Sequence, residues 1–331
     1  MPMENAFVNL LTNQIDNVII PSFIEYQDAL DILNISTQNL SSELSEENAN
    51  DFITAYKNAY LNYQSVAVHN YFATETQGLV INTNLYPIDI EVLNNLIETE
   101  SFNFSLASQE RANGFPVIDY MIFHNNQEGF IPYIEEDNKR LVFLSELVIS
   151  MKDRADRMVE NWTGSLRMNF IDNGGTALGS SISVQLNNSI IYYEEHVREN
   201  KVGIPIGLVG PNDSPIPPDP SKIEAFYEAE AEANEDFTLD LVRSAIQEME
   251  NIYLGNGGQG YDDLLLEREQ SGIDDDIKDL FQRIINEIDN RTSISGNDEL
   301  YNVIQELVTL YKTDLFPVLN VQDADGASDG D

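Results

Sequence analysis

Apolar residues recur along almost the whole chain at alternating steps of three and four residues, and this spacing constrains the fold more than any other feature. An α-helix completes a turn every 3.6 residues, so the spacing gathers apolar side chains on one face. The clearest set is Leu141, Leu144, Val148, Met151, Ala155, Met158 and Trp162. Charged residues lie between these positions and make a solvated face. The same pattern recurs in the segments 52–66, 239–253, 277–288 and 300–311.

No segment alternates apolar and polar residues for long enough to indicate a multi-stranded sheet. The sequence therefore predicts an all-α protein built from packed antiparallel helices. The first helical region spans Glu4–Ile32. Pro21 is expected to kink or split it, because proline lacks a backbone donor and clashes with the preceding turn.

Breaks in the helical pattern indicate where the chain divides. Asp172–Ser181 is rich in glycine and small polar residues and is the best candidate for a domain boundary. Two helical-bundle domains are therefore predicted, covering residues 1–171 and 172–321, with residues 322–331 as an acidic tail. Gly203–Pro220 carries six prolines and is expected to be extended and non-helical.

The charge of the chain excludes some partners. Acidic residues number 57 against 17 basic ones, which gives a formal net charge of −40. A general basic face for nucleic acid is excluded, because phosphates would be repelled, and an anionic membrane surface is disfavoured as a direct partner. No apolar run is long enough to span a bilayer, and no secretory leader is visible in Met1–Leu11. The chain has no cysteine, so thiolate chemistry and disulfides are excluded.

Several familiar catalytic motifs are absent from the sequence. There is no His-Glu-x-x-His zinc helix, no Gly-x-Ser-x-Gly elbow and no phosphate loop ending in Gly-Lys-Ser/Thr. The three histidines, His69, His124 and His196, are far apart in the chain. Each is interpreted as a surface or capping imidazole, since a metal site would need distant ligands to converge.

The segment Asn113–Phe123 carries the most informative chemistry. Gly114 ends one element, and Pro116 suits the first turn of a new helix. Asp119 then lies in an otherwise apolar helix, where an unpaired buried carboxylate would be costly. Two interpretations stay open. Backbone N–H groups and the helix dipole could satisfy Asp119 at a helix start, or Asp119 could be a pocket carboxylate.

The same segment resembles the imelysin family, also called the M75 peptidases. The family signature is Gly-x-His-x-x-Glu, and here Pro116 replaces the histidine and Asp119 the glutamate, between Gly114 and Tyr120. This version is similar to the imelysin-like lipoproteins of Bacteroidetes. Further segments resemble family motifs in the same order along the chain, and these are 20–23, 59–64, 84–89, 178–181 and 201–207.

The resemblance implies two helical domains around a central cleft, with the signature in the pocket between them. It also implies an exported protein of the cell envelope, either in the periplasm or anchored to the outer membrane, since members of the family are exported and often lipid-anchored. Its implied role is iron or haem-related uptake together with envelope uptake proteins. The pocket residues would be Gly114, Pro116, Asp119, Tyr120, Tyr86 and Asp89, with Asp119 facing the ligand.

Departures from the family pattern bear on its chemistry. Proline has no imidazole, so Pro116 can neither bind a metal nor act as a base, and Ala67 stands where relatives often carry a glutamate. No catalytic residue is therefore assigned, the metal is unknown, and iron is the cofactor that the resemblance suggests. Two alternatives to a binding protein remain: an interaction module without a small ligand, and an M75-type metallopeptidase, which would need a metal-bound water and a base.

Overall fold

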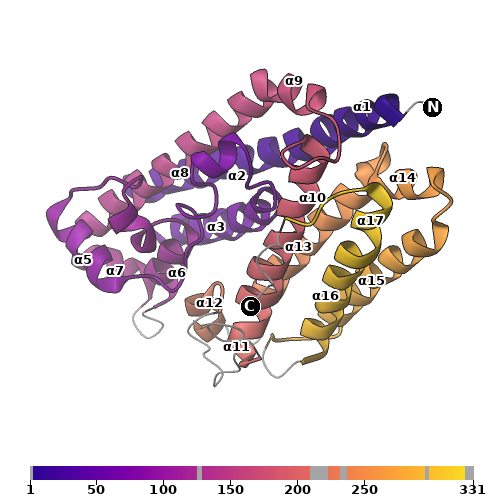
Figure 1. The fold of residues 1–331 in the computed structure, drawn as a ribbon. Coiled ribbons are helices and arrows are strands. Elements are labelled where there is room, and N and C mark those ends of the chain that lie inside the picture. The colour runs from indigo at the N-terminus through magenta and orange to yellow at the C-terminus, as the bar shows by residue number, and fades with distance from the viewer. Residues whose placement is uncertain (1–2, 125–128, 209–222, 232–236, 295–297, 325–331) are drawn as a thin grey trace.

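The computed structural model describes residues 3–124, 129–208, 223–231, 237–294 and 298–324. Every regular element in these ranges is a helix, so the predicted all-α class is confirmed (Figure 1). None of the helices in these ranges is both long enough and apolar enough to cross a bilayer.

The first half of the chain forms long helices that pack together and shorter ones at their ends. Its elements are α1 (Met3–Asn13), η1 (Gln14–Ile19), α2 (Ile20–Ser42), α3 (Glu46–Ala67), α4 (Ala73–Thr76), α5 (Ile90–Thr99), η2 (Ala107–Ala112), α6 (Phe115–Phe123), α7 (Phe130–Glu136), α8 (Lys139–Thr163) and α9 (Ser165–Asp172). Helix α2 packs against both α3 and α8. All seven residues of the predicted stripe on α8 are buried in these contacts.

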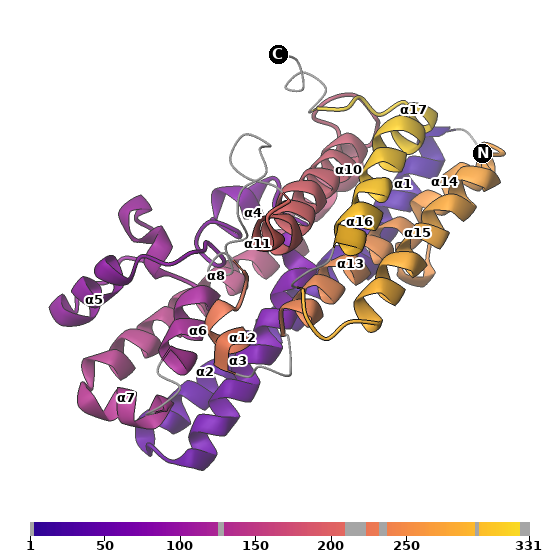
Figure 2. The ribbon, with the colours of Figure 1, turned by 90° about the horizontal axis from the view of Figure 1, so that it is seen from below.

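The second half builds a similar set of packed helices. Its elements are α10 (Ser181–Ile191), η3 (Tyr192–Gly203), α11 (Ile204–Ile206), α12 (Phe226–Ala231), α13 (Phe237–Leu254), η6 (Gly255–Gly257), α14 (Tyr261–Glu267), α15 (Ser271–Asp289), α16 (Asp298–Leu310), η7 (Tyr311–Leu315) and α17 (Phe316–Leu319). Helix α13 packs against α15 in this half and against α3 of the first half (Figure 2).

Buried apolar side chains of both halves form one contiguous cluster. Helix α9 ends at Asp172 and α10 begins at Ser181, so the expected boundary segment is a connection between two helices. The division into domains 1–171 and 172–321 stays a prediction, because the shared core joins the two halves rather than separating them. The predicted acidic tail lies outside the described residues from position 325 onward.

Prolines follow each of the three π-helical segments that the structure describes. Pro21, Pro205 and Pro317 stand second in the helices that come directly after η1, η3 and η7. A proline has no N–H and crowds the carbonyl one turn back, and the wider π-turn lets the chain stay helical there. Pro21 therefore interrupts the α-helical pattern, as expected, while the chain continues as α2 to Ser42.

The expectation of an extended segment over Gly203–Pro220 is wrong at its start. Gly203 closes η3 and Ile204–Ile206 form α11, because the backbone stays helical from η3 onward and the wide π-turn accommodates Pro205. The later prolines of that segment, from Pro211 to Pro220, lie outside the described residues.

Candidate functional site

Gly114 anchors the start of α6 against the segment of residues 80–87. Its φ is +75°, and a Cβ there would lie 2.0 Å from the carbonyl oxygen of Thr83. The same oxygen accepts a hydrogen bond from the N–H of Phe115 at 2.9 Å. Only glycine combines this backbone conformation with so close an approach. The glycine of the signature is therefore needed to dock α6 on the 80–87 segment.

Asp119 joins α6 to α12 rather than facing an open cavity. Its side chain is 1% exposed. Its two carboxylate oxygens accept the N–H groups of Tyr227 at 2.8 Å and Glu228 at 3.1 Å, which lie in the first turn of α12. Figure 2 shows α12 beside α6. Backbone N–H groups at a helix start therefore satisfy Asp119, as one of the two interpretations proposed. The helix is α12, however, which is more than a hundred residues away from Asp119 in the sequence.

Burial dominates the electrostatics of Asp119. It raises the pKa of the carboxyl to about 7, although the two backbone N–H groups oppose the shift. Burial therefore outweighs the backbone N–H groups in setting the protonation of Asp119. The expectation of a ligand-facing carboxylate does not match this geometry, because both oxygens are occupied by α12.

The other predicted pocket residues lie in separate environments. Pro116 is buried in the first turn of α6, and Tyr120 stacks on His124 with ring centroids 4.1 Å apart. Asp89 caps α5, because its side chain accepts the N–H of Val92 at 3.0 Å. Tyr86 differs from these three, since it lines a cavity.

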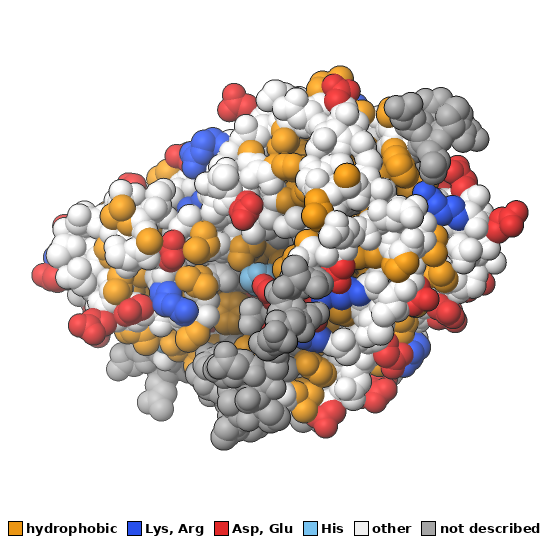
Figure 3. Space-filling view, viewed as in Figure 1, with side chains coloured by type: hydrophobic (Ala, Val, Ile, Leu, Met, Phe, Trp, Pro, Cys, Tyr) orange, Lys and Arg blue, Asp and Glu red, His pale blue; other side chains and the backbone are white. Residues whose placement is uncertain are grey.

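That cavity, of about 110 Å³, lies where the two halves of the chain meet. We call it the η3 cavity. Its polar and aromatic lining comes from α3, the 80–87 segment and η3, and consists of Tyr63, Asn84, Tyr86, Tyr192, His196, Asn200 and Lys201. The space-filling view in Figure 3 shows a hollow near the centre of the molecule, with part of a histidine side chain visible inside it.

A buried ion pair closes one wall of the η3 cavity. Lys201 and Glu224 are 1% and 0% exposed, and the Lys201 ammonium donates to Oε2 of Glu224. Oε1 of Glu224 accepts from the side-chain amides of Gln64, at 3.1 Å, and Asn84. Burial lowers the pKa of Lys201, and the Glu224 carboxylate opposes that shift. The pair is therefore held by hydrogen bonds from both halves of the chain.

The remaining groups around the cavity are neutral at pH 7. His196 stacks on Tyr192, with centroids 5.2 Å apart, and burial lowers its pKa to about 4. Burial also raises the pKa values of Tyr63, Tyr86 and Tyr192 well above their usual range. The cavity thus presents phenol hydroxyls, an imidazole and one paired ammonium group.

These residues do not fit a resident metal ion at the signature. Pro116 has no ligand atom in its side chain, and the Asp119 oxygens are taken by backbone N–H groups. Across the described ranges, no three His, Asp or Glu side chains gather as metal ligands. The raised pKa values of the cavity tyrosines also disfavour phenolate ligands.

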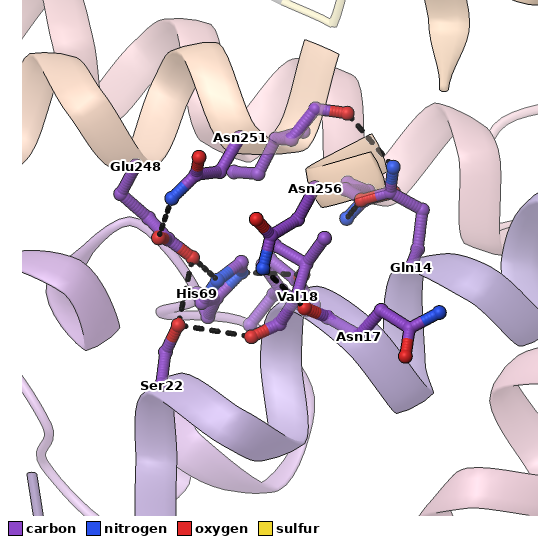
Figure 4. Close-up of polar contacts among 11 residues, drawn as sticks. Gln14, Asn17, Val18, Ser22, His69, Glu248, Asn251 and Asn256 are labelled. Atoms are coloured by element: carbon purple, nitrogen blue, oxygen red, sulfur yellow. Dashed lines mark hydrogen bonds and ion pairs between the residues drawn. The ribbon is translucent and has the colours of Figure 1, made fainter. Parts of the chain in front are cut away.

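A second buried polar cluster surrounds His69, which is not the surface or capping imidazole that we expected from the sequence. His69 is fully buried, with Nε2 3.0 Å from a Glu248 oxygen and Nδ1 3.0 Å from the Tyr71 hydroxyl. Ser22 donates to the same Glu248 oxygen at 3.0 Å (Figure 4). These contacts connect α2 and the residues that directly follow α3 to α13.

Sequence reasoning did not single out Glu224 or the pairing of Lys201. Lys201 is the first residue of segment 201–207, and the resemblance of that segment to a family motif was the one feature of the sequence that pointed to it. Glu224 follows a proline-rich stretch with no periodicity, so no local pattern marks it.

Comparisons with known proteins agree on the fold and the family. One similar solved structure is "a putative iron-regulated protein A precursor" from Parabacteroides distasonis ATCC 8503, with a TM-score of 0.77 and 15% identity, covering 97% of this chain and 96% of that one. Another is an imelysin-like protein from Psychrobacter arcticum 273-4, with a TM-score of 0.74 and 13% identity, covering 97% and 98%. No curated protein sequence matches. The imelysin (peptidase M75) family model matches residues 19–311, and the chain therefore belongs to the imelysin family.

Proposed function

We propose that this protein is a binding protein of the cell envelope that acts in iron or haem-related uptake, and that the η3 cavity receives part of its ligand. The observation that carries the proposal is the buried Lys201–Glu224 pair on the wall of a cavity lined with aromatic hydroxyls. Buried charges are costly to maintain for folding alone, and they concentrate at binding sites. The description of the similar Parabacteroides protein as iron-regulated motivates the iron part of the proposal.

The size of the cavity limits what can enter it. Ligand pockets for drug-sized molecules measure about 300–1,000 Å³. At about 110 Å³ the η3 cavity is smaller than that range, so a whole haem does not fit inside. A single polar group of a larger ligand does fit, such as a carboxylate arm of an iron chelate or a haem propionate. The rest of such a ligand would lie outside the cavity, against the envelope uptake proteins that we propose as partners.

Calorimetric titration of the purified protein with ferric citrate, haem and iron-free citrate tests this function. We expect one of the two iron-containing ligands to bind, and we expect Tyr86→Phe to weaken that binding. Tyr120→Phe is the matched control, because Tyr120 does not line the η3 cavity and its aromatic stacking survives loss of the hydroxyl.

The comparison with iron-free citrate shows whether the metal or only the carboxylate is recognised. Tight binding that is unchanged in Tyr86→Phe would place the ligand elsewhere. Absence of binding for both ferric citrate and haem would contradict the iron-related function.

A further inference from the structure

Several hydrogen-bond donors gather around the η3 cavity. Lys201 is buried, and an ammonium group carries three N–H donors, of which Glu224 receives one. In the part of the chain that the structure describes, the hydroxyls of Tyr63 and Tyr86 have no hydrogen-bond partner. Neither hydroxyl is among the buried polar atoms that lack a partner, so both are open to the cavity and can donate to an acceptor group that enters it, as can the remaining N–H groups of Lys201.

Three side chains at this wall have oxygens that already accept hydrogen bonds. Both oxygens of Glu224 receive donors, from Lys201 on one side and from two amides on the other. The Asn84 side-chain oxygen accepts from Tyr60 at 2.5 Å, and the Gln64 side-chain oxygen accepts from Tyr192 at 3.4 Å. These oxygens are therefore taken, and a cation in the cavity would have only the neutral His196 ring, the Asn200 amide and phenol hydroxyls as ligands, beside the Lys201 ammonium that repels it.

The volume sets the size of the missing acceptor. A cavity of about 150 Å³ holds benzene, which has six heavy atoms. By the same scale, a cavity of about 110 Å³ holds about four or five heavy atoms. Carbonate, acetate and phosphate have this size, and each of them accepts several hydrogen bonds.

We propose that the η3 cavity binds a small oxyanion group through the Lys201 ammonium and the hydroxyls of Tyr63 and Tyr86. This inference rests on the proposed function only in taking the same cavity as the ligand site. A carboxylate, a carbonate and a phosphate share the required chemistry. Lys201 then lies between two anions, Glu224 and the ligand, and the hydroxyls supply the remaining donors.

The test is isothermal titration calorimetry of chelator-treated protein with sodium acetate, bicarbonate and phosphate, in a buffer free of other oxyanions. We expect at least one of the three to bind, and the preferred one identifies the source of the group. A hydrogen bond to a charged partner changes affinity by about tenfold to a hundredfold, and Tyr86→Phe should weaken binding by that factor. Tyr120→Phe should leave it unchanged.

A second variant keeps the proposal testable if single charge changes disturb folding. Lys201→Met combined with Glu224→Gln removes both charges and keeps the side-chain volumes, so the fold should persist while oxyanion binding falls more than tenfold. Binding of none of the three anions would overturn the proposal. Equal affinities in wild type, Tyr86→Phe and the double variant would overturn it as well.

The two proposals fail separately. The anions are titrated without iron, so their failure to bind leaves the ferric citrate and haem results standing. If phosphate or acetate binds and neither iron-containing ligand does, the uptake function is contradicted and the oxyanion site remains.

Discussion

Lys201→Met should destabilise the fold strongly, because it leaves the buried Glu224 carboxylate without its cation. Breaking a buried pair on one side costs about 3–5 kcal/mol. The penalty has an upper bound, since Glu224 can instead take up a proton. Protonation costs about 1.36 kcal/mol for each pH unit above the ordinary glutamate pKa of about 4.3, which gives ~3.7 kcal/mol at pH 7 and ~1 kcal/mol at pH 5. The side-chain amides of Gln64 and Asn84 still donate to Glu224 in the variant and offset part of this cost. The expected loss of unfolding free energy is therefore about 3 kcal/mol at pH 7.

Urea unfolding at pH 7 and pH 5 measures this penalty. For Lys201→Met the loss of unfolding free energy should shrink at the lower pH, because protonation of Glu224 becomes easier. Glu224→Gln should show the opposite trend, since the unpaired Lys201 must lose a proton and this becomes harder as the pH falls. The double variant should stay within about 1 kcal/mol of wild type.

Lys152→Met is the matched control for the loss of a lysine charge. Lys152 pairs with Asp31 and Asp156 on the surface, with its own side chain 24% exposed. Its removal should cost less than about 1 kcal/mol at either pH. The reasoning about the buried pair would be refuted if Lys201→Met cost no more than this control. A penalty for Lys201→Met that did not shrink at pH 5 would also refute it.

Three further predictions follow from the signature segment. Gly114→Ala should destabilise the protein by more than about 2 kcal/mol in urea unfolding, because it combines a positive φ with a clash at Thr83, and a change as small as that of a surface residue would contradict this. Burial raises the pKa of Asp119 to about 7, above its unfolded value of about 3.9, so the stability of wild type relative to Asp119→Asn should be greatest below about pH 4 and should decline as pH rises from there to about 7; a relative stability that increases over this range would contradict this. Chelator-sensitive peptide cleavage should be absent in an assay with unstructured peptides, since Pro116 supplies no base, and reproducible cleavage lost in Asp119→Ala would contradict that expectation.

The helical faces could be predicted from the sequence because each repeats one local rule several times. The stripes on α3, α8, α13, α15 and α16 are buried as expected, since a single misplaced residue does not alter a periodic pattern. Asp119 shows the limit of that rule. Its apolar surroundings predicted a carboxylate in need of donors, but nothing near it in the sequence pointed to the N–H groups of α12.

The candidate site depends on contacts between distant segments, which periodicity does not encode. Glu224 contacts Gln64, Asn84 and Lys201, which are far from it in the sequence, and only the folded structure shows these contacts. His69 was misjudged for the same reason, because its partner Glu248 is 179 residues away. The family resemblance supplied the signature segment, and the structure then separated its packing residues from Tyr86, which lines the cavity.

A crystal structure of the protein grown with ferric citrate and phosphate would test the central claim most directly. The account predicts density for an oxygen-rich group inside the η3 cavity, within hydrogen-bond distance of the Lys201 ammonium and the Tyr86 hydroxyl. Ligand density bound elsewhere, with only ordered water in the η3 cavity, would contradict it.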